Sequence, residues 1–325
     1  MPRVLIAALA ATAALLSLAG DVLAQAYPAK PIRLIVPYPA GGATDFFARL
    51  VFPKLGDALG QPVVVENRPG AGTAIGASEV ARSAPDGYTL LLGDAGTYAF
   101  NPTLYKKLPY DPAKDFAPVS LTGRFALILA VNSSTLNVRS VNEFVQAAKR
   151  APGKIDYGAP GPGSPIHLAM ELFKQRAGIA MTPIPYKGGA DALSDLIGGR
   201  IGALFPDIAT GLPQIRAGKI TALAVASEKR VAALPDLPTV GESGYRGFEA
   251  WAWQGFVAPA RTPHDIVMKL NGAFAKVMAD PAIKQRLSES GFEPQTSTPE
   301  EFATYMKSEI AKWAKVIHDS NISLD

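Results

Sequence analysis

The apolar positions of this chain fall into two alternating patterns. Short continuous runs bounded by turn residues are typical of strands buried on both faces, and apolar residues that recur every three or four positions are typical of helices packed on a sheet. After residue 30 the patterns predict a strand at 31–37, a helix at 44–59, a strand at 62–66, a helix at 73–83 and a strand at 88–92. Strands that alternate with helices indicate a parallel sheet covered on both faces.

A second series of this kind follows the apolar segments APVSLTG and FALILAVN and a helix that runs from the capping box of Ser140 and Glu143 to near Gly153. It predicts, in order, the strand KIDYGAP, the helix SPIHLAMELFKQRAG, the strand MTPIPY, the helix ADALSDLIGG and the strands RIGALF and KITALAVAS. Prolines and glycines at 234–247 indicate a long connection, and WAWQGFVAPA indicates a strand that returns to the first sheet. Thr-Pro pairs at 262–263 and 298–299 predict the starts of two final helices.

The composition is that of a globular chain with an apolar leader. At 325 residues, with 48% apolar and 18% charged positions, the chain can bury a large core and is long enough for two domains. Residues 1–26 pass from Arg3 into an alanine-rich apolar stretch and end in small residues at Val22 and Ala24, or at Ala24 and Ala26. We interpret this segment as a secretory signal peptide rather than a transmembrane anchor.

Cysteine content and charge narrow the classes of partner. The chain has no cysteine, which excludes a disulfide framework, a thiolate metal site and a cysteine nucleophile, and together with export this favours a bacterial periplasm. The formal net charge is +4, but Lys and Arg are scattered among acidic residues. The pattern therefore predicts no nucleic-acid partner, while a weak positive field can still steer a small anion towards a cleft.

Two glycine-rich turns follow predicted strands, one in each alternating series. In PYPAGGATDFFARL, at 37–50, Thr44 is placed as an N-cap and Asp45 lies in the first helical turn. In YGAPGPGSPIHLAMELF, at 157–173, Ser164 is placed as an N-cap before Pro165, and nearby glycines leave the backbone open.

Each turn is expected to point unpaired backbone N–H groups outward. A helix start carries about half a positive charge and several free donors, so it can hold a carboxylate or phosphate without Lys or Arg. Taken singly, an ordinary strand–helix turn is the simpler interpretation of each. The pair favours an anion site, because ligands of open α/β sheets bind at the carboxyl ends of the strands.

From Tyr27 onward the chain resembles the Bug-type extracytoplasmic solute receptors of tripartite tricarboxylate transporters. The resemblance covers essentially the whole mature chain. It rests on YPAKPIRLIVPYPAGGATD, VVVENRPGAG, PDGYTLL, NPTLY with LPYDPAKDFAPV, GSPIHLAMELF, PYKGGADALSDLIGGRI and LPDLPTVGESG, in this order.

The resemblance implies an α/β, two-domain periplasmic-binding-protein fold of the Venus-flytrap type II kind, with a mixed, mainly parallel sheet in each domain. Domain 1 would hold 27–122 and 250–325, and domain 2 would hold 123–249, with the ligand cleft between them. The binding loops map onto 39–45 and 161–167. The implied partners are a small carboxylate, held by backbone amides, hydroxyls and ordered water, and the membrane subunits of a tripartite transporter; we expect a monomer.

We take thirteen positions as candidate ligand-binding residues. They are Tyr38, Ala40, Gly41, Gly42, Ala43, Thr44, Asp45, Thr97, Gly161, Gly163, Ser164, His167 and Asp207. Similar receptors more often have GGG or GGS where this chain has GGA, so Ala43 is expected to tighten or reshape the first loop. The turn GDAGTYAF also departs from the family pattern, which makes Thr97 and Tyr98 candidates for specificity, with core packing equally open for Tyr98.

Other chemistries find little support in the sequence. The three histidines, His167, His264 and His318, are far apart, and we expect no dedicated metal site. His167 either contacts the ligand or packs against its loop, and Asp207 either faces the cleft or, as we favour, caps the next helix. Neither a GxSxG elbow nor a P-loop ending occurs, so we expect no catalytic residue and no cofactor.

The favoured function is therefore a periplasmic receptor that closes on a small carboxylate. The alternative is a periplasmic carboxylate sensor or hydrolytic enzyme that uses the same cleft. Which carboxylate binds is left open by the sequence, and core burial is favoured for both Trp251 and Trp253.

Overall fold

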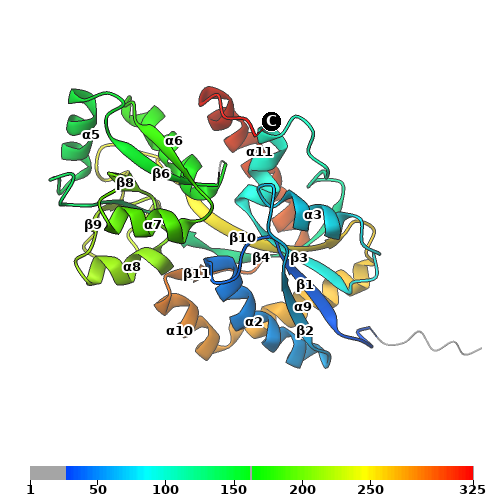
Figure 1. Cartoon of the computed structure of the whole chain (residues 1–325). Coiled ribbons are helices and arrows are strands. Elements are labelled where there is room, and N and C mark those ends of the chain that lie inside the picture. The colour runs from blue at the N-terminus through cyan, green and yellow to red at the C-terminus, as the bar shows by residue number, and fades with distance from the viewer. Residues whose placement is uncertain (1–26, 162, 325) are drawn as a thin grey trace, which may run out of the picture.

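The protein is described here by a computed structural model that covers residues 27–161 and 163–324. The expected signal peptide at 1–26 lies outside these residues. Two lobes lie side by side, each built on one β-sheet with helices on both faces (Figure 1). Within the described part of the chain, no helix combines the length and the apolar character needed to cross a membrane.

The first lobe contains a six-stranded sheet with the order β11-β4-β10-β3-β1-β2. Its strands are β1 (Ile32–Val36), β2 (Val63–Asn67), β3 (Thr89–Asp94), β4 (Phe116–Ala126), β10 (Trp251–Pro259) and β11 (Phe292–Pro294). The strands β2, β1 and β3 are parallel, and β10, β4 and β11 continue the sheet antiparallel. The returning strand predicted from WAWQGFVAPA is β10, which lies between β3 and β4.

Helices cover both faces of this sheet because its strands are apolar on both sides. One face carries α2 (Ala43–Leu59), α9 (His264–Ala279) and α10 (Pro281–Glu289), with Phe47, Phe52 and Phe274 in a shared core. The other face carries α3 (Ala74–Ala81), the π-helical turn η1 (Gly96–Phe100), α4 (Asn101–Leu104) and α11 (Pro299–Asp319). The sheet is thus the middle layer of three.

The second lobe contains a five-stranded sheet with the order β7-β6-β8-β5-β9. Its strands are β5 (Ile128–Val131), β6 (Asp156–Pro160), β7 (Thr182–Tyr186), β8 (Ala203–Leu204) and β9 (Thr221–Val225). The strands β7, β6 and β8 are parallel, whereas β5 runs antiparallel to β8 and β9. The helices α5 (Val141–Arg150) and α6 (Pro165–Ala177) cover one face, and α7 (Gly189–Ile197) and α8 (Ile208–Arg216) cover the other.

The edge strand β7 has prolines at Pro183 and Pro185. The backbone groups of its even-numbered residues face β6: Thr182 N–H donates to Ile155 O, and Tyr186 O accepts from Gly161 N–H. Because successive residues of a strand point to opposite sides, the two prolines occupy outward-facing positions, where no ladder hydrogen bond is lost.

The chain crosses between the lobes at a narrow waist. It passes from β4 to β5 at Leu127 and returns from β9 to β10 through residues 226–250. Ala226 N–H donates to Leu127 O at 2.8 Å, and Ala250 N–H donates to Ala226 O at 2.9 Å, so the crossing segments are hydrogen-bonded to one another. The expected domain limit between 122 and 123 falls inside β4.

Several helix starts differ from the sequence predictions. The helix α2 begins at Ala43 with Gly42 as N-cap, so the prediction of Thr44 as N-cap is wrong. The capping box at Thr298 and Glu301 is present in α11, but Pro263 is the N-cap of α9, and the hydroxyl of Thr262 donates to Pro259 O instead. In the described part of the chain three helices follow β10, whereas the sequence predicted two; α10 is the helix that was missed.

Candidate ligand-binding site

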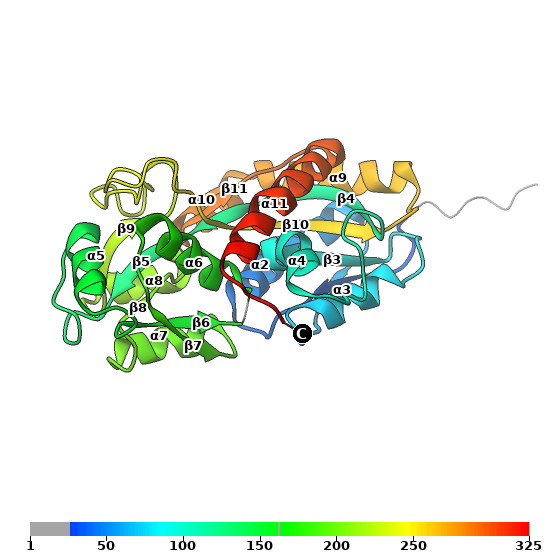
Figure 2. The same ribbon diagram turned by 90° about the horizontal axis from the view of Figure 1, so that it is seen from above.

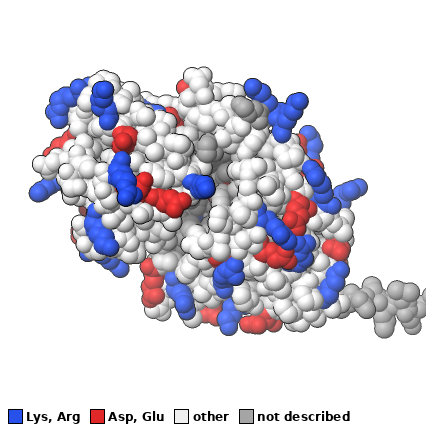
Figure 3. Space-filling view, viewed as in Figure 1, with Lys and Arg blue, Asp and Glu red and all other residues white. Residues whose placement is uncertain are grey.

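The carboxyl ends of β1, β3 and β6 face the space between the lobes, where open α/β sheets bind ligands. Loop 38–42, after β1, and the turn after β6 lie on the same side of the molecule in both ribbon views (Figures 1 and 2). Between the lobes the surface is hollowed, and its visible walls are largely uncharged (Figure 3). Such a cleft has to recognise a charged ligand mainly through dipoles and neutral donors.

Loop 38–42 presents backbone donors at the start of α2. Gly42 has φ −82° and ψ 174°, and no side chain caps the helix. The first backbone hydrogen bond of the helix runs from Phe46 N–H to Gly42 O at 2.9 Å, so the N–H groups of Gly42, Ala43 and Thr44 precede it. The turn through Ala40 and Gly41 directs the Gly42 N–H back towards Pro39 O, so the free backbone donors among the described residues are the N–H groups of Ala43 and Thr44. Gly42 is exposed and Ala43 half-buried, which leaves the helix start open to an anion.

Asp45 holds the same loop in shape together with Asn67 and Arg49, which the sequence analysis did not identify as site residues. Asp45 Oδ2 accepts from Gly41 N–H at 2.9 Å and Asp45 Oδ1 from the Asn67 amide at 3.0 Å, and Arg49 donates to both oxygens. Asn67 also donates to Tyr38 O at 3.0 Å and accepts from Arg49. Burial alone would raise the pKa of Asp45, but these hydrogen bonds lower it, so Asp45 is a buried anion committed to the loop.

A second buried carboxylate, Asp94, lies at the end of β3 beneath Tyr38. The Tyr38 hydroxyl donates to Asp94 Oδ2 at 2.6 Å, and Thr97 N–H donates to Asp94 Oδ1 at 3.1 Å. Burial raises the pKa of the Asp94 carboxyl, and the hydrogen bond from Tyr38 opposes this shift. The Thr97 side chain is fully buried against Asp94, so the candidate Thr97 lies behind the cleft wall.

Tyr98 and the tryptophans pack into the core. Tyr98 is fully buried, stacks on Trp253 with ring centroids 6.1 Å apart, and accepts from Gly93 N–H. Core packing is therefore its role. Trp253 is fully buried, and Trp251 is 6% exposed at the waist.

Gln254, on β10, is a buried polar residue at the base of the cleft that sequence reasoning missed. It pairs in register with Asp94, and its amide donates to Thr44 Oγ1 at 2.9 Å. The Thr44 hydroxyl oxygen thus accepts from Gln254, and the hydroxyl proton is available to donate. Gln254 Oε1 is buried without a partner among the described residues. A buried amide oxygen left unpaired is costly, which marks the spot as one that a bound molecule or water can complete.

The turn after β6 differs from the expectation of free N–H groups. Ser164 does cap α6 and Pro165 is its first residue. However, Gly161 N–H donates to Tyr186 O, Ser164 N–H to Gly161 O, and Gly163 N–H to His167 Nδ1 at 3.1 Å. The prediction of unpaired N–H groups is therefore wrong for these residues. The Ser164 hydroxyl accepts from His167 N–H at 3.2 Å and keeps its proton for a further acceptor.

His167 packs against this turn. Its side chain is buried, and its ring lies nearly parallel to the Tyr157 ring. Because Nδ1 accepts from Gly163, the neutral imidazole carries its proton on Nε2, which lies 3.8 Å from Glu171 Oε1. Burial lowers the pKa of His167; Glu171 raises it and Lys174 lowers it further.

Asp207 caps α8, as favoured from the sequence. Its Oδ1 accepts from Thr210 N–H at 2.9 Å. Burial raises the pKa of Asp207, and the hydrogen bonds from Thr210 oppose this shift.

The start of α7 adds donors that sequence reasoning missed. Its N-cap is Gly188, no side chain caps it, and it directly follows β7, the neighbour of β6. A Cβ placed on Gly189 would lie 3.3 Å from the Ile166 side chain, so this helix start adjoins the turn after β6. Lys187, just before it, is exposed and has no ion pair among the described residues. The repeated glycines of PYKGGAD were the available signal.

The two lobes touch near the site. A Cβ placed on Gly163 would lie 2.0 Å from Leu104 Cδ1, so the turn after β6 packs against α4 of the first lobe. Nearby, the Gln175 amide of α6 donates to Val316 O at 3.1 Å and to Ser320 Oγ at 2.6 Å, at the end of α11. Within the described chain, no group of three His, Asp or Glu side chains is placed to hold a metal ion.

Comparison with known proteins identifies the family. Residues 47–322 match the model of the tripartite tricarboxylate transporter family receptor, TctC. The chain belongs to this receptor family. Protein BugT of Bordetella pertussis is 38% identical over 308 residues, which cover 94% of each chain.

Several solved structures that are 30% or more identical in sequence have the same fold. A protein described as a periplasmic transporter is 43% identical with a TM-score of 0.85, over 92% of this chain and 100% of the other. Rpa4515 of R. palustris with adipate is 38% identical with a TM-score of 0.86 (91% and 99%), and MatC of Rhodopseudomonas palustris with bound malate is 32% identical with a TM-score of 0.82 (90% and 100%). The fold is that of the two-domain periplasmic binding proteins, as predicted.

Proposed function

We propose that this TctC-family protein is a periplasmic solute receptor that captures a small carboxylate between its lobes and delivers it to the membrane subunits of a tripartite transporter. The observation that carries the proposal is the open start of α2, where no side chain caps the helix and the N–H groups of Ala43 and Thr44 have no partner among the described residues. Two relatives with this fold were solved with adipate and malate, which supports a carboxylate as ligand class.

In this proposal one ligand carboxylate accepts hydrogen bonds from the N–H groups of Ala43 and Thr44 at the start of α2. The second lobe contributes the Ser164 hydroxyl and the start of α7, after Gly188. The helix dipoles add about 0.3–2 kcal/mol each, and neutral donors avoid the desolvation cost of a buried ion pair. Of the candidates, Tyr38, Asp45, Thr97 and His167 then act by shaping the two loops.

A thermal-shift screen over aliphatic dicarboxylates, tricarboxylates, amino acids and aromatic acids tests the ligand class. A ligand at one hundred times its Kd should stabilise the protein by about 2.7 kcal/mol. Absence of any stabilising acid, or turnover of a carboxylate ester or amide by the purified protein, would contradict the receptor proposal.

The α2 donors are tested with Ala43→Pro. Ala43 is the first residue of α2, where proline fits, and Gly42 before it is extended at φ −82° and ψ 174°, as a residue before proline prefers, so the variant removes one N–H with little strain. We expect the carboxylate from the screen to bind about tenfold or more weakly by calorimetry, since a hydrogen bond to a charged group contributes about 1.5–3 kcal/mol. Ala43→Ser keeps the N–H and is the matched control; equal affinity of Ala43→Pro and Ala43→Ser would overturn this assignment.

Delivery, export and a monomeric state belong to the same proposal. Removal of residues 1–26 during secretion is checked by the mass of the exported chain. Size-exclusion chromatography with light scattering checks for a monomer. Ligand-dependent retention of transporter subunits from solubilised membranes checks delivery.

A further inference from the structure

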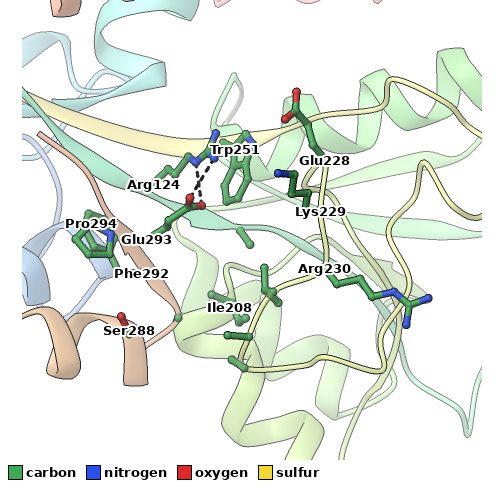
Figure 4. A pocket seen from close by; sticks show the side chains of 15 residues that line it. Arg124, Ile208, Glu228, Lys229, Arg230, Trp251, Ser288, Phe292, Glu293 and Pro294 are labelled. Atoms are coloured by element: carbon green, nitrogen blue, oxygen red, sulfur yellow. Dashed lines mark hydrogen bonds and ion pairs between the residues drawn. The ribbon is translucent and has the colours of Figure 1, made fainter. Parts of the chain in front are cut away.

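A cavity of about 430 Å³ opens on the opposite side of the waist from the candidate ligand site. In the first lobe it is lined by the ends of β4 and β10 and by the α10–β11 turn, and in the second lobe by the start of α8 and residues 228–233 (Figure 4). The sheet orders place β11 and β9 at the far edges from β1 and β6, which carry the cleft loops. In Figure 2 β6 and the turn after it lie on one side of β10, and α10 and β11 lie on the other.

The floor of this rear cavity is apolar and joins both lobes. Ile208, Phe292 and Val231 line it beside Trp251. A Cβ placed on Gly291 would lie 2.2 Å from Ile208 Cγ2, so the α10–β11 turn and α8 are in direct contact there. A molecule with an apolar body can bury it on this floor and touch both lobes at once.

Among the charged side chains that line the cavity, one cation has no ion pair with any residue that the structure describes. Arg124 is paired with Glu293 at 3.1 Å and lies 3.8 Å from the centroid of the Trp251 ring, and Arg230 is paired with Glu242 at 3.0 Å. Lys229 has no ion pair among the described residues. In Figure 4 its ammonium points towards Trp251 inside the cavity, whereas the ends of Glu228 and Arg230 point away.

The Trp251 ring forms the wall beside Lys229. Trp251 is 6% exposed, and its indole N–H is buried without a partner among the residues that the structure describes, so this N–H faces the protein and not the cavity. The exposed Lys229 ammonium and the apolar floor are together complementary to an anion with an apolar body.

We propose that the rear cavity is a second ligand site, for a small amphiphilic anion, and that its occupation favours the closed cleft. Rotation of the lobes about the waist that opens the cleft brings the α10–β11 turn and residues 228–233 together. An occupant of the rear cavity resists that motion and therefore shifts the population towards the closed form. The coupling, unlike the site, rests on the proposed function.

The site is tested with phenylacetate as the probe, followed by tryptophan fluorescence, with Trp251→Phe to assign the signal. Phenylacetate should bind saturably to the full mature chain and to Ala43→Pro. It should bind about tenfold more weakly to Lys229→Ala, with no change in Lys219→Ala, an exposed lysine outside the cavity, and the neutral phenylacetamide should bind more weakly than the anion. Loss of binding in Ala43→Pro but not in Lys229→Ala, or no saturable binding, would overturn the site.

The coupling is tested without any cleft ligand. Small-angle scattering should give a smaller radius of gyration for the wild-type chain with phenylacetate than without it, and no change for Lys229→Ala. An unchanged radius in wild type, under conditions where fluorescence shows saturation, would overturn the coupling and leave the site standing. Failure of the carboxylate screen would instead count against the proposed function and leave the rear site standing.

Discussion

At the residue scale, the wall of the candidate site depends on a buried carboxylate with few donors. Asp94 is 6% exposed, and the Tyr38 hydroxyl is the shortest of its hydrogen bonds within the described chain. Desolvation of a carboxylate is costly unless each oxygen is hydrogen-bonded. The side chain of Tyr38 therefore has a structural role, since it pairs with Asp94, while its backbone belongs to loop 38–42.

Tyr38→Phe should lower the free energy of unfolding by about 1–3 kcal/mol, because it leaves Asp94 Oδ2 without this donor. Urea unfolding at fixed pH measures the loss. Tyr186→Phe is the matched control, because Tyr186 donates to Asp195, whose side chain is 24% exposed and also paired with Arg200. Equal losses in the two variants would show that burial of Asp94 does not decide the effect.

His167 gives the turn after β6 a dependence on pH. Burial lowers its pKa below the ordinary 6.5, so the unfolded chain takes up a proton at a higher pH than the folded chain does. Stability should therefore fall as the pH drops from about 6.5 towards the lower folded pKa and stay level above that range. The groups that face the ring are Tyr157, Glu171, Lys174 and Gly163 N–H.

His167→Asn tests this dependence, because an amide oxygen can accept from Gly163 N–H without titrating. The difference in unfolding free energy between wild type and His167→Asn should shrink between about pH 7 and about pH 5.5. His318→Asn, at an exposed histidine, serves as the control. A difference that stays constant over this range would contradict the assignment.

The site residues that sequence could reveal were those with local partners. The Ser164 and Asp207 side chains each accept a hydrogen bond from the N–H three residues later in the chain, and this spacing can be recognised in a single sequence. Asp94 and Gln254 act through partners 56 and 210 positions away, respectively, and no local pattern marks them. The pairing of Gly161 N–H was missed for the same reason, since its acceptor is Tyr186 O on β7. The acceptor of Gly163 N–H, His167 Nδ1, is only four residues away, but a sequence does not show that the imidazole folds back onto the turn.

At the scale of elements, the contact between the turn after β6 and α4 sets how closely the lobes approach. Gly163 has φ +74° and Gly161 has φ +64°, so alanine at either position pays the left-handed cost of about 1–2 kcal/mol. Only Gly163 also meets another element, because a Cβ there reaches Leu104.

Gly163→Ala should therefore destabilise the protein more than Gly161→Ala, whose Cβ would meet only Ser164 Cβ at 3.9 Å. Adding Leu104→Ala should remove the excess, and a double-mutant cycle from denaturant unfolding measures it. Additive effects of Gly163→Ala and Leu104→Ala would show that α4 does not limit this turn.

The long amphipathic helices and buried strands were predictable because their apolar residues recur with the period of the face that packs on the core. The elements that were missed lack such a period. The turn η1 and the adjoining α4 are buried almost throughout, so GDAGTYAF has no polar face to mark a helix. The helix α10 is short and begins at Asp280, which also ends α9, so it has no long apolar period of its own to mark it.

At the scale of the whole molecule, Gln175 joins the lobes on the side of α11. If the cleft closes on its ligand, this contact belongs to the state described here and has to break when α6 moves away from α11. Gln175→Ala should weaken ligand binding about fivefold, mainly through faster dissociation, since a hydrogen bond contributes about 1 kcal/mol. Stopped-flow release of the carboxylate found by screening measures this.

Gln285→Ala is the control, because the Gln285 amide donates within α10, to Glu289. Unaltered release from Gln175→Ala would mean that the α6–α11 contact persists when the cleft opens.

The two crossings of the chain were implied by the family resemblance and the returning strand by the sequence pattern. The contacts between the lobes, Gly163 with Leu104 and Gln175 with Ser320, join residues far apart in the chain, for which one sequence carries no pattern.

The prolines of β7 have a consequence for how copies of this protein meet. An exposed edge strand offers a row of amide hydrogens that a second β-strand can use, and such pairing is a common route to fibrils. Pro183 and Pro185 delete those hydrogens on the outward side while the inward ladder to β6 stays whole. The exposed edge of β7 can thus lie against other copies of the protein without pairing with their strands.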